Sequence, residues 1–250
     1  MPKIVKNTTF FSLLDLLAPH SCRGCGHIGD VLCDRCKNYI IRTARPVCPY
    51  CKSEILPTVP ASNTSPITTQ ALTTPLSCPK CTTDPDLPPA YVVSDRSGLL
   101  DLLIHEYKYD SVRALGHHLA ELLDYRLPTF QRHTAIVPLP TATNHVRSRG
   151  FDHTLHLAKN LSHIRHYKIT PLLIRAKNTT QVGADKNTRE KQADSAYNLD
   201  AHYQIEPDTT YLLLDDISTT GASIKSAVKK LRQAGANHIA IALLAVSILN

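Results

Sequence analysis

The sequence lacks any long apolar run. No stretch approaches the roughly 20 residues that span a bilayer, although apolar residues make up 42% of the 250. Near the N-terminus, apolar residues recur at helical spacing between Phe10 and Leu17. Asp15 interrupts them, and no small-residue cleavage site of a signal peptide follows. We therefore predict a packed core, no membrane span and a short amphipathic helix over residues 1–21.

Cysteine is absent after residue 81. The eight cysteines form four Cys-x-x-Cys pairs, namely Cys22/Cys25, Cys33/Cys36, Cys48/Cys51 and Cys78/Cys81. Two such pairs supply the four thiolates of a closed tetrahedral zinc site, so the module 22–81 is predicted to hold two Cys₄ sites with one structural Zn²⁺ ion each. A disulfide framework is the alternative, and it needs an oxidising compartment. Without a signal peptide, we expect a cytoplasmic protein.

The cysteine pairs can share two metal ions in two ways. Sequential pairing leaves seven residues between Cys25 and Cys33 and 26 between Cys51 and Cys78. Interleaved pairing leaves 22 residues between Cys25 and Cys48 and 41 between Cys36 and Cys78. We favour the sequential arrangement because shorter loops cost less entropy to close. Within the second of these loops, fourteen of the 25 residues in 53–77 are Ser, Thr or Pro, which predicts a disordered insertion.

Acidic and aromatic residues are scarce in the most basic segment. Residues 141–192 hold ten Lys or Arg and three Asp or Glu, an excess equal to the formal net charge of +7. Such an excess fits a polyanion, either a phosphate-rich small molecule or nucleic acid, and a solvated basic loop is the alternative. Only Phe151 and Tyr167 are aromatic there, so stacking on nucleic-acid bases has little support.

Residues 90–250 alternate strand-like and helix-like patterns. We expect strands over 91–93, 135–137, 171–174, 211–214 and 239–246, and helices around 99–107, 115–123, 155–161 and 222–234. Such alternation predicts an α/β domain with a mostly parallel sheet and helices on both faces. Residues 176–198 are polar and weakly periodic, which indicates a long loop.

The segment 212–223 is the strongest candidate for a ligand site. An apolar strand leads into Asp215 and Asp216, and a helix opens with Thr219, Thr220, Gly221, Ala222 and Ser223. Ligands of open α/β sheets bind at the carboxyl ends of the strands, glycine permits close approach, and a helix N-terminus favours an anion. Capping of the strand and helix is the alternative, but two adjacent carboxylates at a buried strand end are costly for that purpose. We predict carboxylates for sugar hydroxyls beside a phosphate cradle.

This segment resembles the phosphoribosyl pyrophosphate signature of type I phosphoribosyltransferases. The whole chain resembles the ComF family (competence protein F, GntX-like), which joins a double zinc ribbon to such a domain. The further similar motifs are Leu103–Tyr109, Val137–Pro140, Arg147–Phe151 and Arg175–Gln181 with Arg189 after it. One departure is clear: the family usually has Asn-Gln after Arg-Gly-Phe, where this sequence has Asp152 and His153.

The resemblance implies a type I phosphoribosyltransferase-like fold that binds phosphoribosyl pyrophosphate with Mg²⁺. Asp215 and Asp216 would be catalytic, binding the ribose hydroxyls, and residues 219–223 would hold the 5′-phosphate. The turn Pro138, Leu139 and Pro140 would lie against the pyrophosphate, with Lys108, Arg147 and Arg149 as candidates for its charge. Surface exposure is the alternative for each of these three cations. The loop 176–198, with Gln181 and Arg189, would close over the ligand.

The resemblance also implies a role in DNA uptake during natural competence, with single-stranded DNA and a DNA-uptake helicase as partners. The alternative is a phosphoribosyltransferase of nucleotide salvage that acts on an unknown nucleophile. The two hypotheses differ in whether the bound phosphoribosyl group is sensed or transferred.

Overall fold

The computed structural model describes residues 20–45, 47–54, 78, 81, 84, 86–110, 112–130, 132–176 and 196–248. Nearly all of the predicted N-terminal helix over 1–21 lies outside the described residues. The same holds for the predicted insertion from residue 55 onward and for Gln181 and Arg189.

The centre of the fold is a five-stranded sheet. Its strands are β1 (Ala90–Asp95), β2 (Thr134–Pro138), β3 (Lys168–Ile169), β6 (Thr210–Ser218) and β7 (His238–Val246). They lie in the order β1-β7-β6-β2-β3, and every neighbouring pair is parallel. β7 is buried along nearly its whole length, as expected of an apolar parallel strand covered on both faces. The predicted mostly parallel sheet is confirmed.

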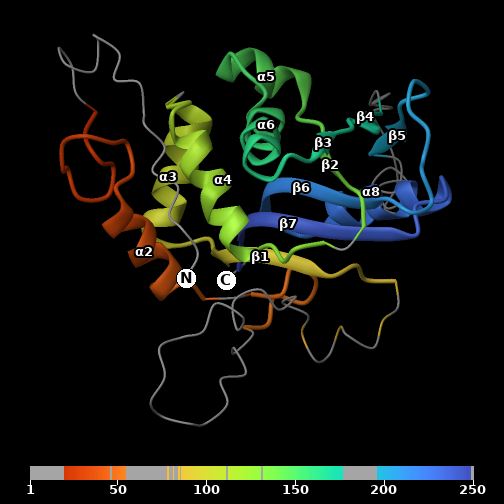
Figure 1. Ribbon diagram of the computed structural model, residues 1–250, viewed down its shortest axis with the longest axis horizontal. Helices are drawn as coiled ribbons and strands as arrows, with labels where there is room; N and C mark the ends of the chain where they lie inside the picture. The colour runs from red at the N-terminus through yellow and green to blue at the C-terminus, as the bar shows by residue number, and fades with distance from the viewer. Residues whose placement is uncertain are drawn as a thin grey trace, which may run out of the picture.

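Helices cover both faces of this sheet (Figure 1). The helices α3 (Gly98–Tyr109), α4 (Leu115–Arg126) and α6 (His153–Arg165) lie on one face, and α8 (Ala222–Gln233) lies on the other. Successive strand residues point to opposite faces. Accordingly Leu212 and Leu214 pack in the core with α3, α4 and α6, whereas Tyr211 and Leu213 pack with α8. A small antiparallel sheet of β4 (Leu173–Arg175) and β5 (Tyr197–Leu199) adds Leu173 and Tyr197 to the core on the α8 side.

The order of connections places a topological switch point between β2 and β6, and we call the region outside the carboxyl ends of these two strands the crevice. From β2 the chain continues through α5 (Thr143–Arg149) and α6 to β3, whereas from β6 it continues through α8 to β7 on the opposite side. The two connections diverge, and in open α/β sheets ligands bind at such a switch point, outside the carboxyl ends of the strands. β2 ends at Pro138, opposite Leu214. The residues of β6 beyond Leu214 therefore border this crevice.

The cysteine-rich region reaches both faces of the sheet. Cys22, Leu32 and Ile40, the last in α2 (Asp34–Thr43), belong to the core on the side of α3 and α4, and Val47 belongs to the core on the side of α8. Between them the chain passes the edge strand β1. There the backbone N–H of Asp95 donates to the carbonyl of Arg45 at 2.9 Å, and the two side chains form an ion pair at 2.9 Å.

Three features differ from the sequence-based expectation. β6 runs to Ser218 rather than ending at Leu214, because Asp215, Ile217 and Ser218 continue to pair with β7. The strand expected over 171–174 appears instead as β3 and β4, on either side of Thr170–Leu172. The helices α2 and α5 were not expected.

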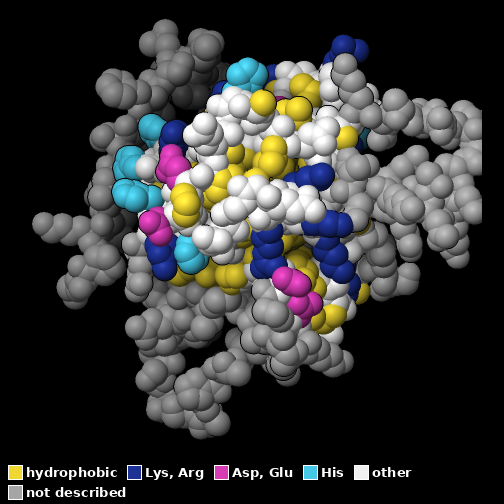
Figure 2. All heavy atoms as spheres, turned by 90° about the vertical axis from the view of Figure 1, so that its right-hand side faces the viewer, with side chains coloured by type: hydrophobic (Ala, Val, Ile, Leu, Met, Phe, Trp, Pro, Cys, Tyr) yellow, Lys and Arg dark blue, Asp and Glu magenta, His cyan; other side chains and the backbone are white. Residues whose placement is uncertain are grey.

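Within the part of the chain that the structure describes, no helix has both the length and the apolar character needed to cross a bilayer. On the face drawn in Figure 2, Lys and Arg side chains cover more of the surface than Asp and Glu side chains, and histidines gather along one margin. The formal net charge of +7 is thus reflected at this end of the molecule.

Candidate functional site

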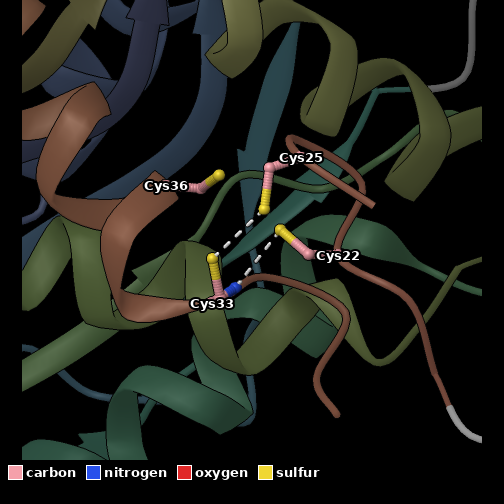
Figure 3. Close-up of side chains that lie close together, drawn as sticks. All are labelled: Cys22, Cys25, Cys33 and Cys36. Atoms are coloured by element: carbon pink, nitrogen blue, oxygen red, sulfur yellow. Dashed lines mark hydrogen bonds between the residues drawn. The ribbon is translucent and has the colours of Figure 1, made fainter. Parts of the chain in front are cut away.

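The eight cysteines form two clusters of four. The first cluster consists of Cys22, Cys25, Cys33 and Cys36, and the second cluster consists of Cys48, Cys51, Cys78 and Cys81. Within each cluster the four sulfur atoms lie within 4.8 Å of one another. Figure 3 shows the sulfurs of the first cluster converging from a turn and from the start of α2. The preferred sequential partition is confirmed.

The sulfur spacing fits a tetrahedral metal site. The Sγ atoms are 3.6 Å apart for Cys25 and Cys33 and 3.4 Å apart for Cys51 and Cys78. Sulfurs bound to one zinc at about 2.3 Å stand about 3.8 Å apart, whereas a disulfide needs about 2.05 Å. None of the eight cysteines forms a disulfide. Because each cluster brings four cysteine sulfurs together, the donor set fits a closed structural site.

Two local features hold the first cluster in place. Cys33 is the N-cap of α2 and Cys36 lies in its first turn, where the helix dipole favours a thiolate. Gly24 leaves room for the sulfur of Cys36, since a Cβ at this position would lie 2.7 Å from that Sγ.

The two predicted carboxylates lie inside β6. Because they are adjacent strand residues, Asp215 and Asp216 project to opposite faces of the sheet. Asp216 is only 4% exposed and points toward α3 and α6. Its Oδ2 lies 2.8 Å from Nζ of Lys108 and 2.6 Å from Nε2 of His153. Asp215 lies on the α8 side, near Tyr197.

The surroundings shift the pKa values of the two carboxyl groups in opposite directions. Burial acts to raise the pKa of Asp216, but the hydrogen bond from His153 and the charge of Lys108 outweigh it, so this pKa falls below its ordinary range. Burial and the neighbouring charge of Asp216 raise the pKa of Asp215 well above its ordinary range. The crevice therefore offers one firmly ionised carboxylate and one that retains a proton readily.

Residues 219–223, which are predicted to hold a phosphate, lie at the turn from β6 into α8. Gly221 is the N-cap of α8 and has φ 79°, a left-handed conformation that favours glycine. Thr219, Thr220, Ala222 and Ser223 are exposed. The first amides of a helix have no partner within it, and an anion is favoured there. The geometry of this turn fits a phosphate group.

The proline turn after β2 lies next to the carboxylates. Leu139, between Pro138 and Pro140, donates its N–H to the carbonyl of Leu214 at 2.9 Å. The carbonyl of Pro140 accepts from Nε of Arg175 at 3.3 Å. The turn is thus fixed on one side by β6 and on the other by β4, at the mouth of the crevice.

The three candidate cations differ in placement. Lys108 contacts Asp216 directly. Arg149 reaches the site through His153, with 3.0 Å between Nη1 and Nδ1, and its guanidinium lies 4.9 Å over the ring of Tyr109. Arg147 is exposed on α5, and among the described residues no contact joins it to either carboxylate.

Sequence reasoning missed the role of the pair that departs from the ComF pattern. Asp152 is the N-cap of α6, and its Oδ1 accepts from the N–H of Leu155 and the hydroxyl of Thr141, both at 3.0 Å. His153 is 5% exposed and contacts Asp216. The replacement of Asn-Gln by Asp152 and His153 drew attention to this position. The contact itself was not predictable, because Asp216 is distant from His153 in the sequence.

Together the fold and the site define an α/β protein with a carboxylate-lined crevice at a sheet switch point, carrying two four-cysteine clusters. No protein-family model and no curated protein matches the sequence. Among solved structures, 56% of the chain overlies 29% of the allosteric regulatory enzyme of purine biosynthesis, with a TM-score of 0.40 and 15% identity. The overlap with a hypoxanthine phosphoribosyltransferase from Staphylococcus aureus covers 56% of this chain and 65% of that one, with a TM-score of 0.32 and 16% identity. The chain spans less than two thirds of either structure, so the function is inferred from the site's own residues.

Proposed function

We propose that this chain binds phosphoribosyl pyrophosphate together with Mg²⁺ in the crevice at the carboxyl ends of β2 and β6. The observation that carries the proposal is a single strand–turn–helix unit. It joins Asp215 and Asp216 to an exposed turn at a helix N-terminus, with glycine in the left-handed conformation at its N-cap. Sugar hydroxyls and a phosphate ester need these two kinds of partner at adjacent positions.

Each part of the ligand has a partner in this proposal. Asp215 and Asp216 bind the ribose hydroxyls, and the charge of the ionised Asp216 would offset the positive charge of an oxocarbenium-like transition state. Residues 219–223 hold the 5′-phosphate. The turn 138–140, Lys108 and Arg149 face the pyrophosphate, and Arg147 stays a prediction from the sequence. Mg²⁺ binds with the pyrophosphate and neutralises part of its charge.

The two clusters bind one structural zinc ion each in this proposal. The donor set and the sulfur spacing support this assignment. We place the protein in the cytoplasm, where thiols stay reduced.

For the biological role, we propose a ComF-like association with DNA uptake in natural competence, with single-stranded DNA and a DNA-uptake helicase as partners. The basic net charge and the basic face in Figure 2 support a polyanionic partner. A phosphoribosyltransferase of nucleotide salvage, acting on an unidentified nucleophile, is the second candidate, and the raised pKa of Asp215 favours it because perturbed carboxyl groups are typical of catalytic sites.

The test is titration calorimetry of phosphoribosyl pyrophosphate with Mg²⁺ against the wild-type chain and Asp216→Asn. We expect at least about a tenfold loss of affinity, equal to about 1.4 kcal/mol. The control is Asp101→Asn, because Asp101 lies on α3 in an exposed ion pair with Arg96. Equal affinity in wild type and Asp216→Asn would sink the site assignment.

Two further assays separate the candidate roles. Pyrophosphate release in the presence of nucleophilic acceptors supports transfer. Single-stranded DNA binding that weakens steeply with salt supports the DNA role, since each neutralised phosphate releases counterions.

A further inference from the structure

The imidazole of His153 connects two groups of the proposed ligand site. Its Nε2 lies 2.6 Å from Oδ2 of Asp216, and its Nδ1 lies 3.0 Å from Nη1 of Arg149. A guanidinium has donors only, so Nδ1 accepts the hydrogen bond. A neutral ring then carries its proton on Nε2, the nitrogen that lies beside Oδ2 of Asp216. The contacts select a neutral imidazole of one defined tautomer.

The surroundings of His153 hold this arrangement. The carbonyl of His153 accepts from the hydroxyl of Tyr107 at 2.8 Å, which fixes the first turn of α6. Lys108 shares Oδ2 of Asp216 at 2.8 Å. Arg149 is positioned by Tyr109, whose hydroxyl lies 3.4 Å from Nη2.

The other titratable groups nearby have different partners. Asp152 caps α6, His156 contacts the hydroxyl of Tyr107 at 2.9 Å, and Asp215 projects from the far face of β6. Among the described residues, Arg149 is the charged group in contact with Nδ1. Protonation of Nδ1 would place its N–H against an N–H of the Arg149 guanidinium, and two donors cannot form a hydrogen bond with each other. Protonation therefore requires Arg149 to move.

We propose that His153 takes up a proton at Nδ1 when Arg149 leaves it for the pyrophosphate of the ligand, so that binding is coupled to the uptake of one proton. The proton comes from solvent, and no covalent bond forms or breaks. Asp216 remains beside Nε2 and stabilises the imidazolium. Lys108 keeps its contact with Asp216 in both the free and the bound state. His153 is thus a positioning residue that adds a positive charge beside the pyrophosphate. The inference rests on the proposed function.

The consequence is a ligand affinity that depends on pH. Because the bound state holds one proton more than the free state, linkage makes affinity fall with rising pH, by at most about tenfold per pH unit.

The first test uses the free protein and needs no ligand. In ¹⁵N-labelled full-length chain, the imidazole nitrogen resonances of His153 should show a proton on Nε2 near neutral pH. Arg149→Met removes the donor that faces Nδ1, so His153 should become protonated at a higher pH than in the wild type. A proton on Nδ1 in the free protein, or an unchanged titration in Arg149→Met, would overturn the proposal.

The second test measures the proton directly. Calorimetry with phosphoribosyl pyrophosphate and Mg²⁺, in two buffers of different ionisation enthalpy, should show uptake of one proton more by the wild type than by His153→Gln. The amide of glutamine, the usual residue of the resembled family here, can donate to Asp216 and accept from Arg149 but cannot be protonated. Protons exchanged by the ligand itself are common to both proteins. Glutamine should restore part of the affinity that His153→Ala loses.

The two tests separate the possible failures. No binding heat in the wild type contradicts the proposed function, and the coupling with it, whereas the tautomer is still decided by the resonances of the free protein. Binding with the same proton count in wild type and His153→Gln overturns the coupling alone.

Discussion

The backbone carbonyl oxygen of Pro49 lies 3.2 Å from the position that a Cβ on Gly221 would occupy. Pro49 stands between Cys48 and Cys51, so the second cluster packs directly against the turn that begins α8. The proposed phosphate cradle is therefore supported from behind by a cysteine turn. The second cluster therefore helps to set the shape of the proposed site.

Gly221→Ala should damage both stability and ligand binding. The left-handed conformation at φ 79° costs a residue with a Cβ about 1–2 kcal/mol, and the contact with Pro49 displaces the turn. Urea unfolding and calorimetry measure the two effects. Gly235→Ala is the matched control, because Gly235 has φ +96° but its Cβ would meet nothing within 4 Å. Gly235→Ala should lose similar stability and keep its affinity for the ligand. An equal loss of affinity in the two variants would contradict the role of the Pro49 contact.

Loss of metal from the first cluster and from the second cluster should have different effects on ligand binding. Cys36→Ser and Cys81→Ser should each reduce the zinc content from about two ions per chain to about one, as measured by elemental analysis. Only Cys81→Ser should weaken ligand binding, because the second cluster adjoins Gly221. Equal binding by the two variants would show that the second cluster does not support the turn, and zinc-free protein with intact disulfides would overturn the metal assignment.

The adjacent carboxylates should respond oppositely to amide substitution. The pKa of Asp215 is raised in the folded state. Such a group contributes stability to the folded protein below its unfolded pKa, and this contribution is lost as pH rises through the folded pKa. Asp215→Asn should therefore stabilise the protein at neutral pH, by about 0.5–2 kcal/mol. Asp216→Asn leaves Lys108 and His153 without their carboxylate and should cost about 3–5 kcal/mol.

Denaturant unfolding at neutral pH compares these two variants, and calorimetry should show weaker ligand binding by both. A stability change of the same sign in both would contradict the electrostatic assignment.

The contact between α2 and α4 should respond to acid. Oε2 of Glu121 lies 3.0 Å from Nζ of Lys37 and 3.2 Å from Nδ1 of His118. Burial opposes ionisation, but these two partners outweigh it and lower the pKa of Glu121 to about 2. A lowered folded pKa gives stability that is present above the unfolded value and lost as pH falls toward 2.

Glu121→Gln should therefore cost about 1 kcal/mol near neutral pH, a modest figure because the side chain is partly exposed and screened by solvent. The deficit should shrink in acid, as followed by denaturant unfolding at several pH values. Asp101→Asn, in an exposed ion pair, should change stability less. A deficit that stays constant down to about pH 2 would contradict the ionic origin of the contact.

The fold was predictable where the signal is local. The apolar runs in 135–137, 211–214 and 239–246 indicate buried strands by themselves, and short loops between cysteine pairs favour the observed partition. The extension of β6 was not predictable, because Asp215 and Asp216 have low strand propensity and are held in the strand by pairing with β7.

The site was predictable in its parts but not in its connections. The pattern of 212–223 located the carboxylates and the cradle, and the basic residues were found by composition. Which of them approach Asp216 depends on where α3, α5 and α6 end relative to β6. His153 follows the N-cap of α6 and meets a partner from a distant strand, so no local pattern in the sequence indicates that contact.

The passage of the chain beside β1 has a consequence for the fate of the metal-free protein. β1 is an edge strand, and an uncovered edge can pair with the strands of other molecules. Arg45, which bonds to Asp95 at the end of this strand, is held between the two cysteine clusters. A chain starved of metal would lose the anchors on both sides of Arg45 and expose that edge. Its first failure would then be self-association that grows with protein concentration, and supply of metal during synthesis would govern how much protein survives to bind any ligand.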